Sequence, residues 1–418
     1  MAQYWHDNIG KVDPGGTMVT TNELPYPNEA ELAHTTKMAR FLVSYIQEKG
    51  GQISFADFFE QALYHEEYGY YTGALPIFGT EGDFITAPLV SPFFSYGLAN
   101  QVIEVAENLG GTYNILEIGA GSGVMAADVL THLKKHDCLP EKYLILERSP
   151  HLKGEQHAHL LKTHPDLIDR IEWIDEAPSE NWRGVLLANE VIDALPVERF
   201  RFENGKPYYV DVALNIDQAN ESVSLTPTLR ESDEALNQFI AELAEYEITF
   251  NDGFESEYCP LLHDWLPEVT QTLTEGVALF IDYGYDEAEY YRPERKTGTL
   301  IAHYKHHAHE DFYLYPGLQD LTANVNFTQV AMIAEAAGMD VLGYTTQNFF
   351  LFGNQLETLL TEAKANTPDE VEWYRISQGV QEVVLPDAMG ERFKVMALGR
   401  NYEHDLQGFS LAEYSYQL

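Results

Sequence analysis

The chain has 418 residues, enough for one elaborated domain or two. Its 66 acidic and 25 basic residues give a formal net charge of −41, which disfavours nucleic acid as a partner because the field repels phosphates and no basic patch is visible. The two cysteines form no disulfide framework, no apolar run approaches the roughly 20 residues of a membrane span, and the first residues lack a basic or apolar leader. These features predict a cytoplasmic protein. The acidity suits an ordinary soluble protein, although it would also attract a basic protein segment.

The first part of the chain is predicted to be helical after an irregular arm over residues 1–27, which holds Pro and Gly turns. Asn28 can cap a helix that ends at the glycine pair 50–51. Ser54, with an acid three residues later, can open a second helix that runs through Tyr64. Residues 28–111 are therefore expected to form a helical region before the main sheet.

From residue 112 onward, apolar strands alternate with helices. The expected strands are 114–118, 143–147, 171–174, 184–188, 276–283, 341–344 and 392–399. Such alternation predicts a parallel sheet covered on both faces, which is an α/β fold with a doubly wound, Rossmann-like sheet.

The interval between the fourth and fifth strands is too long for a plain connection. Residues 199–275 contain a hairpin signal at Asn204-Gly205 and a helix-like acidic segment near 231–244. We predict an inserted lid or substrate subdomain over these residues. The expected core then comprises 112–198 and 276–402, with a C-terminal tail at 403–418.

The run Ile115-Leu-Glu-Ile-Gly-Ala-Gly-Ser-Gly-Val124 joins the first strand to a helix, and its glycines stand on alternate positions, at Gly119, Gly121 and Gly123. Glycine lets a ligand approach the backbone and suits a turn with unusual dihedral angles. A dinucleotide fingerprint would need glycine at Val124, which argues against a nicotinamide-dependent oxidoreductase. The form E-x-G-x-G-x-G, which begins at Glu117, is typical of class I S-adenosylmethionine (SAM) methyltransferases. The plainer alternative is a turn that binds nothing.

Two further acids are expected at strand ends. In an open parallel sheet, ligands bind beyond the carboxyl ends of the strands. Glu147 follows the second strand, where a carboxylate can accept both hydroxyls of a ribose. Asp175 follows the third strand, where it can meet the amino group of an adenine. The alternative for each is a solvated acid at the end of a strand.

Polar residues also follow the fourth strand, in Asn189-Glu-Val-Ile-Asp193. A methyl acceptor would lie there beside the methyl donor. Glu190 and Asp193 are three residues apart, so a helical turn would place both carboxylates on one face. Two carboxylates can bind a guanidinium, orient one of its nitrogens and assist proton loss, which makes Glu190, Asp193 and Asn189 the candidate catalytic residues. Alternatively, the two acids only cap a helix.

Four histidines lie close together, at His303, His306, His307 and His309. Their spacing matches no common zinc site, and neither a cysteine nor a compact acid pair accompanies them. We expect no metal site there and interpret the segment as a solvated or substrate-facing loop.

Taken together, the motifs resemble those of the MidA-like family of SAM-dependent methyltransferases, which includes a mitochondrial complex I assembly factor that methylates protein arginine. The resemblance covers roughly residues 52–400. The motifs that carry it are Tyr68-Gly-Tyr-Tyr71, Gly82-Asp-Phe-Ile-Thr-Ala-Pro88 with Ser91, Glu117-Ile-Gly-Ala-Gly-Ser-Gly123, Asn189-Glu190 with Asp193-Ala-Leu-Pro196, Ile281-Asp-Tyr-Gly284, Gly298-Thr-Leu300, and Asp320-Leu-Thr-Ala323 with Phe327.

The resemblance implies a class I methyltransferase sheet with added helices, SAM as the cofactor, and a protein side chain as the acceptor, with arginine favoured. It also implies that residues 82–91 line the cofactor pocket, with Asp83 and Thr86 as cofactor-binding residues. A respiratory complex subunit is then a candidate partner. The chain departs from the family pattern at Leu89, where glutamate is usual, and at Asn324, where histidine is usual. These departures favour the rival hypothesis of a non-catalytic, SAM-binding assembly factor.

Overall fold

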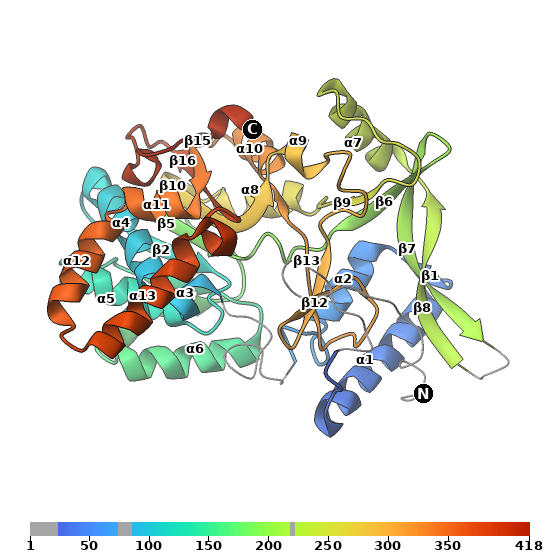
Figure 1. Cartoon of the computed structure of the whole chain (residues 1–418), viewed down its shortest axis with the longest axis horizontal. Helices are drawn as coiled ribbons and strands as arrows, with labels where there is room; N and C mark the ends of the chain where they lie inside the picture. The colour runs from blue at the N-terminus through green and yellow to red at the C-terminus, as the bar shows by residue number, and fades with distance from the viewer. Residues whose placement is uncertain (1–23, 74–85, 218–221) are drawn as a thin grey trace. The chain divides into compact units, whose positions relative to one another are not determined.

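The structure, a computed structural model, describes residues 24–73, 86–217 and 222–418, which divide into two compact units (Figure 1). Unit 1 comprises the described residues within Met1–Phe84, Ala194–Leu261 and Ala288–Asn324. Unit 2 comprises the described residues within Ile85–Asp193, Leu262–Glu287 and Val325–Leu418. The interval 199–275 that was expected as one insertion is thus shared between both units. Its role as a lid stays a prediction.

Unit 2 is built on an eight-stranded mixed sheet of order β15-β16-β10-β5-β2-β3-β4, with β14 paired to β10. Neighbours from β10 to β4 are parallel, and β16 runs antiparallel to both β10 and β15. The strands are β2 (Asn114–Ile118), β3 (Tyr143–Leu146), β4 (Ile171–Ile174), β5 (Trp182–Asn189), β10 (Leu273–Tyr285), β14 (Val325–Asn326), β15 (Asp340–Thr346) and β16 (Phe393–Arg400). All seven strands expected from the sequence are confirmed, but the sheet is mixed, so the expected parallel pairing holds only from β10 to β4 and is wrong for β15 and β16.

The helices of unit 2 pack around this sheet, and its core is apolar. Ile115, Leu187, Ile281 and Val395, which come from four neighbouring strands, belong to one buried cluster. The helices are α3 (Ala87–Val90), α4 (Pro92–Leu109), α5 (Val124–Lys135), α6 (Pro150–Thr163), α8 (Leu262–Thr270), α10 (Phe327–Ala336), α11 (Gln347–Gly353), α12 (Leu356–Asn366) and α13 (Glu370–Val384), with short helical turns at Ile168–Arg170, Pro386–Gly390, Gln407–Phe409 and Ser415–Gln417.

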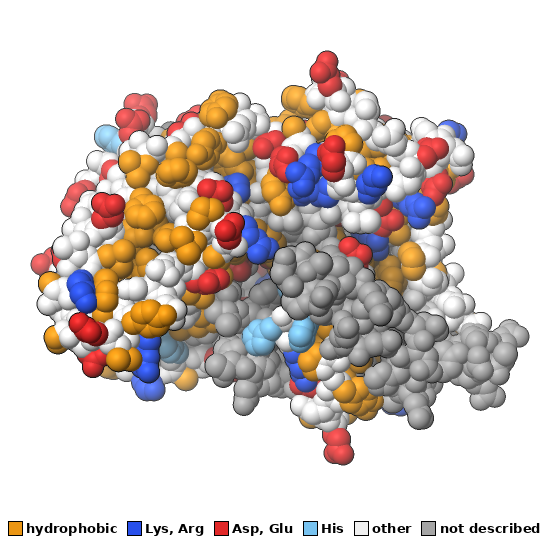
Figure 2. Space-filling view, in the orientation of Figure 1, with side chains coloured by type: hydrophobic (Ala, Val, Ile, Leu, Met, Phe, Trp, Pro, Cys, Tyr) orange, Lys and Arg blue, Asp and Glu red, His pale blue; other side chains and the backbone are white. Residues whose placement is uncertain are grey.

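The helices α11 to α13 lie in residues 347–384, where no element was predicted. Figure 2 shows hydrophobic side chains gathered over this part of unit 2. Val371 and Tyr374 on α13 are 63% and 61% exposed, and Phe352 on α11 is also exposed. Among the described residues, no helix is long and apolar enough to cross a membrane.

Unit 1 contains two smaller sheets. One has the order β1-β7-β6-β9 with β8 paired to β7, and the other has the order β12-β11-β13. Its strands are β1 (Gln52–Ile53), β6 (Glu198–Glu203), β7 (Lys206–Asp217), β8 (Ser222–Glu231), β9 (Glu255–Tyr258), β11 (Ile301–Tyr304), β12 (His307–His309) and β13 (Asp320–Thr322). Its helices are α1 (Glu29–Glu48), α2 (Phe55–Tyr64) and α7 (Glu234–Glu245), and α9 (Glu287–Tyr290) begins at the last unit 2 residue before the chain enters unit 1.

Local signals in the sequence account for several boundaries in unit 1. The Asn28 side chain accepts hydrogen bonds from Ala30 N and Glu31 N, and so caps α1 as expected. Ser54 Oγ likewise accepts from Asp57 N, 3.0 Å away, at the start of α2. The predicted hairpin turn is also confirmed, because β6 and β7 pair across Asn204 and Gly205.

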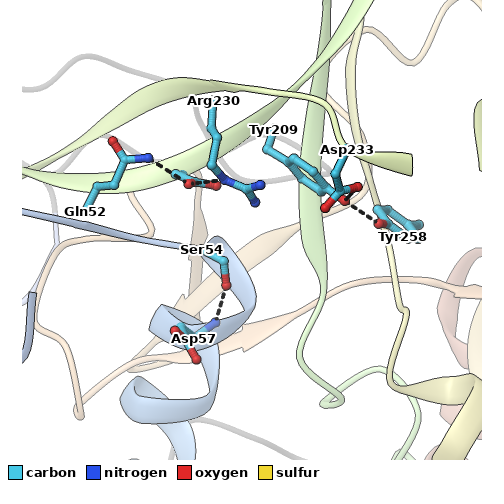
Figure 3. A network of polar contacts seen from close by, with 8 residues as sticks. Gln52, Ser54, Asp57, Tyr209, Arg230, Asp233 and Tyr258 are labelled. Carbon is cyan, nitrogen blue, oxygen red and sulfur yellow. Dashed lines mark hydrogen bonds and ion pairs between the residues drawn. The ribbon is translucent and has the colours of Figure 1, made fainter. Parts of the chain in front are cut away.

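A polar network joins three strands of the larger unit 1 sheet to the start of α7 (Figure 3). Asp211 Oδ2 accepts from Arg230 Nε at 2.6 Å and from Gln52 Nε2 at 3.2 Å. The Arg230 guanidinium lies 4.0 Å from the centre of the Tyr209 ring, and the Tyr209 hydroxyl donates to Asp233, the N-cap of α7. A buried carboxylate with hydrogen-bonded partners ties β1, β7 and β8 together.

The Gly298-Thr-Leu300 motif encloses a buried carboxylate in the same unit. Glu257 Oε1 accepts from Thr299 N at 2.8 Å, Thr299 Oγ1 at 2.6 Å and the Tyr290 hydroxyl at 2.9 Å. Gly298 has φ +76°, and a Cβ on it would lie only 2.1 Å from Glu257 Oε2. Glycine is required there for both reasons.

We therefore expect Gly298→Ala to lower the free energy of unfolding by about 3 kcal/mol or more, since it adds a clash to the strain of a left-handed backbone. Gly205→Ala is the matched control, because Gly205 has φ +73° but no atom within 4 Å of its would-be Cβ. That variant should lose only about 1–2 kcal/mol. Thermal and denaturant unfolding measure both, and equal losses would contradict the role given to the Glu257 contact.

Candidate functional site

The glycine turn, residues 119–123, connects β2 to α5 with three glycines in the left-handed region. Their φ angles are +66° at Gly119, +53° at Gly121 and +78° at Gly123. A Cβ on Gly123 would lie 3.3 Å from Gln156 Cα, and a Cβ on Gly119 would lie 3.3 Å from Val191 Cγ2. The turn therefore lies against α6 on one side and against the residues that follow β5 on the other.

Glu117, two residues before the turn, is fully buried in β2. The Tyr143 hydroxyl donates to its Oε2 at 2.6 Å. Within the described residues its Oε1 is buried and lacks a hydrogen-bond partner. Burial raises the pKa of Glu117 to about 7, and the charge of Glu147 adds to this effect. Such an acceptor suits a ligand that brings a cation.

Glu147 lies directly after β3 and is held by two donors. Its Oε1 accepts from Ser149 N and its Oε2 accepts from Gln156 Nε2, both at 2.9 Å. Gln156 also donates to Gly121 O at 2.9 Å and accepts from Trp173 Nε1 at 3.0 Å. Burial raises the pKa of Glu147, although these hydrogen bonds oppose the rise. Each oxygen keeps a lone pair for a ligand hydroxyl.

Gln156 is a site residue that the sequence analysis missed. It connects the glycine turn, Glu147 and β4. A glutamine in the middle of a helix carries no local signal, because only the packing of α6 against the turn reveals its partners. The glycine turn itself also gives no indication that Gln156 is its partner.

Three other expected cofactor residues are less closely tied to the turn. Asp175 is exposed after β4 and forms an ion pair with Lys153. Thr86 is the N-cap residue of α3, and its carbonyl accepts from Leu89 N at 2.9 Å. Asp83 lies outside the described residues. The roles of all three stay predictions.

The acidic turn, residues 189–193, continues β5 beyond the sheet. Its N-terminal residue Asn189 donates from Nδ2 to Glu190 Oε1 at 3.0 Å. Glu190 has φ +53°, which is unusual for a residue other than glycine. Burial and then the charge of Asp193 raise the pKa of Glu190 to about 8. The three residues follow one another here, but no helix begins between β5 and β6, so the expected helical turn with both carboxylates on one face and the alternative of a helix cap are both wrong. Their contact with an acceptor stays a prediction.

The histidine segment lies in unit 1 on β11 and β12. His309 is buried, its Nδ1 accepts from Asp311 N at 3.2 Å, and burial lowers its pKa to about 4. In the parts of the chain that the structure describes, no group of three or more His, Cys, Asp or Glu side chains is placed to hold a metal ion.

A family model described as "Putative S-adenosyl-L-methionine-dependent methyltransferase" matches residues 97–345, which include the glycine turn and the acidic turn. The chain belongs to this family. The methyltransferase is also 34% identical to a Burkholderia thailandensis protein whose crystal structure contains bound S-adenosyl-homocysteine, the product that SAM leaves after methyl transfer. That match has a TM-score of 0.87 and covers 95% of this chain and 100% of the other.

Curated relatives carry a more specific name. The human "Protein arginine methyltransferase NDUFAF7, mitochondrial" is 28% identical, over 89% of this chain and 85% of its own length. The Drosophila melanogaster homologue is 28% identical, over 83% of this chain and 82% of its own length. Both names contradict the cytoplasmic localisation expected from the sequence, and that expectation is wrong. Two of its premises, unpaired cysteines and the lack of a membrane span, do not distinguish one reducing compartment from another, and the third, the expectation of no leader, is overruled by the names of these relatives.

The residues of unit 2 fit SAM, the cofactor of this family. The three left-handed glycines carry no Cβ that would keep a ligand from the backbone of residues 119–123, and the buried Glu117 Oε1, which has no partner among the described residues, could accept from an ammonium group. Glu147 lies at the end of the neighbouring strand, where its carboxylate oxygens could accept hydrogen bonds from the ribose hydroxyl groups of SAM.

We expect Glu147→Ala to weaken SAM binding about ten- to hundredfold, because a charge-assisted hydrogen bond contributes roughly 1.5–3 kcal/mol. Calorimetric titration measures the dissociation constant. Glu172→Ala is the control, since Glu172 is an exposed residue of neighbouring β4 whose partner is Lys142. Unchanged affinity in a folded Glu147→Ala variant would mean that other groups bind the ribose.

We expect the ligand-free methyltransferase to be less stable at high pH because Glu117 is buried. Its pKa of about 7 exceeds the ordinary 4.5, so the folded state keeps a proton that the unfolded chain loses, and stability falls as the pH rises from 5 to 8. Glu117→Gln should therefore raise the free energy of unfolding at pH 8 by on the order of 2–3 kcal/mol, with little change at pH 5. Thermal unfolding at both pH values tests this. A change in the free energy of unfolding that is the same at pH 5 and pH 8 would contradict it.

Proposed function

We propose that this methyltransferase transfers the methyl group of SAM to a guanidino nitrogen of an arginine side chain in a partner protein. The observation that carries the proposal is the acidic turn beside the glycine turn, within one unit. The name of the NDUFAF7 relatives supports the same acceptor class. The identity of the partner, including a respiratory complex subunit, stays a prediction.

The register of the sheet supports the juxtaposition of the two turns. Ile118 at the end of β2 pairs with Ala188 in parallel β5, so Gly119 and Asn189 leave adjacent strands at the same level. Val191 touches the position that a Gly119 side chain would occupy. A methyl donor held at the glycine turn would thus have the carboxylates of Glu190 and Asp193 nearby.

These carboxylates suit a cationic acceptor. A guanidinium is planar and binds carboxylates through paired hydrogen bonds, which would orient one nitrogen for in-line attack. The approach of this cation lowers the pKa of Glu190, which burial has raised to about 8, and restores its carboxylate form. The carboxylate can then accept the proton that the nitrogen must lose as the new carbon–nitrogen bond forms.

SAM supplies a methyl group on a sulfonium, a leaving group that becomes a neutral thioether. The chain's own contribution is position and charge. Asn189 orients Glu190 by donating to Oε1, and the negative pair stabilises a positive acceptor. The rival hypothesis of a non-catalytic assembly factor rests on Leu89 and Asn324 alone. Leu89 lies in α3 of unit 2, and Asn324 N donates to Thr299 Oγ1 in unit 1.

We expect Glu190→Gln to reduce the rate of methyl transfer at least about a hundredfold while SAM affinity changes little, because the amide keeps the shape but accepts no proton. Label from methyl-labelled SAM, counted in protein and located by mass spectrometry, measures transfer. Glu275→Gln is the matched control at the opposite end of the β5–β10 pair, where Glu275 binds Arg183 on the surface.

The outcomes separate the hypotheses. If Glu190 only caps the turn, Glu190→Gln would keep full transfer and lose roughly 0.5–2 kcal/mol of stability. If the protein only binds a partner, the wild type would label no protein. Label on a residue other than arginine would overturn the proposed acceptor.

A further inference from the structure

The motif Ile281-Asp-Tyr-Gly284 belongs to β10 and has been given no role so far. Its first residue bonds to the acidic turn, because Ile281 O accepts from Glu190 N at 2.9 Å. Its last residue allows β14 to approach, since a Cβ on Gly284 would lie 2.2 Å from Val325 O. The two residues between them contact the acidic turn with their side chains.

Asp282 bonds to the backbone of the acidic turn. Its Oδ2 accepts from Ile192 N at 3.1 Å and from Asp193 N at 3.2 Å, while its Oδ1 accepts from Tyr283 N at 3.0 Å. The side chain is only 1% exposed. Burial, and then the charges of Asp193 and Glu190, raise the pKa of Asp282 well above its ordinary value. The residue occupies a place where an acid is costly.

Tyr283 bonds to the side chain of the same turn. Its hydroxyl donates to Asp193 Oδ2. Its ring packs edge-on against Phe393 of the adjacent strand, with the ring centres 5.4 Å apart and the planes at 86°. Because Phe393 fixes the ring, the hydroxyl fixes one oxygen of the Asp193 carboxylate.

We propose that Asp282 and Tyr283 are positioning residues for the acids that bind the acceptor, Asp282 through the backbone of residues 192–193 and Tyr283 through the Asp193 carboxylate. This inference rests on the proposed function. The preceding stretch of β10, from Val277 to Ile281, is wholly buried and apolar. An apolar residue at 282 would therefore continue the core without a buried charge, so the acid there serves the turn rather than the sheet.

The strained backbone of Glu190 supports the same assignment. A left-handed glutamate persists only where its surroundings hold it. Glu190 N is bonded to Ile281 O, and the next two bonded amides, those of Ile192 and Asp193, are bonded to Asp282. Consecutive residues of one strand thus hold both ends of the acidic turn.

The test of Tyr283 is Tyr283→Phe, which removes one hydroxyl and keeps the ring. We expect the initial rate of label transfer, at saturating SAM and with the proteins of a mitochondrial extract as acceptors, to fall ten- to hundredfold while the SAM dissociation constant stays within twofold. Tyr113→Phe is the matched control. Its hydroxyl donates to Cys138 O at 2.5 Å, just before β2 at the other end of the sheet. It should keep the wild-type rate.

A Tyr283→Phe rate within twofold of wild type would overturn the role of Tyr283. Acid hydrolysis of the labelled protein identifies the methylated residue and tests the proposed function separately. If the wild type labels a residue other than arginine, the proposed acceptor fails, while the ratio of the two rates still decides the role of Tyr283.

The test of Asp282 does not depend on transfer. In Asp282→Asn, the amides of Ile192 and Asp193 should exchange hydrogen at least tenfold faster than in the wild type, while those of the buried β5 residues Val185 to Ala188 keep their rates. Unchanged exchange at Ile192 and Asp193 would overturn the assignment. If Asp282→Asn does not fold, Asp282→Glu replaces it, because the longer side chain keeps the acid but moves its oxygens away from the amides of Ile192 and Asp193, with the same expected direction.

Discussion

The parallel pairing of β5 with β10 determines where the chemistry of unit 2 can lie. The ladder runs from Leu273 opposite Trp182 to Ile281 opposite Asn189, and the bond from Glu190 N to Ile281 O extends it by one residue. The chain therefore leaves β5 along a path set by its neighbour. On the other side, β2 ends at the same level, which places the glycine turn next to the departing chain.

Electrostatics in this region are unusual because three acids, Glu190, Asp193 and Asp282, share one buried neighbourhood. Loss of solvent and the charges of their neighbours raise the pKa values of Glu190 and Asp282 and so favour the neutral forms of these two acids. Under the proposed function, a cation that enters between the acids would lower these pKa values and so restore the carboxylates that bind it. The same arrangement would disfavour an anionic acceptor, so the proposed site would select by the charge of its acceptor as well as by the contacts made after binding.

Much of the fold was predictable because its signals are local. Asn28 and Ser54 mark helix starts by their own hydrogen bonds, Asn204-Gly205 marks a hairpin, and buried strands such as 114–118 show as short apolar runs. The places of the glycine turn after β2 and of Glu190 and Asp193 after β5 were also predictable from residue type and strand order, while their roles stay predictions.

The rest depends on contacts between distant segments. Gln156 joins α6 to the glycine turn across 35 residues, and Asp282 meets Ile192 across 90. Neither of these two contacts produces a pattern that can be recognised in a single sequence. The helices α11 to α13 and the strand β8 were missed. An amphipathic pattern in such an interval fits more than one secondary structure, and only the elements that pack against it decide which one forms. The predicted localisation was wrong for a different reason, because amino-acid composition does not determine the compartment in which a protein resides.

The left-handed Glu190 has a consequence for how this protein can change over generations. Glycine or asparagine would adopt φ +53° with less strain, so substitution to either relieves the backbone while it deletes a carboxylate. Selection for stability of the fold alone would therefore replace glutamate at this position. If the proposed function holds, a lineage would retain the glutamate for its carboxylate, and a laboratory variant stabilised by losing it would lose methyl transfer.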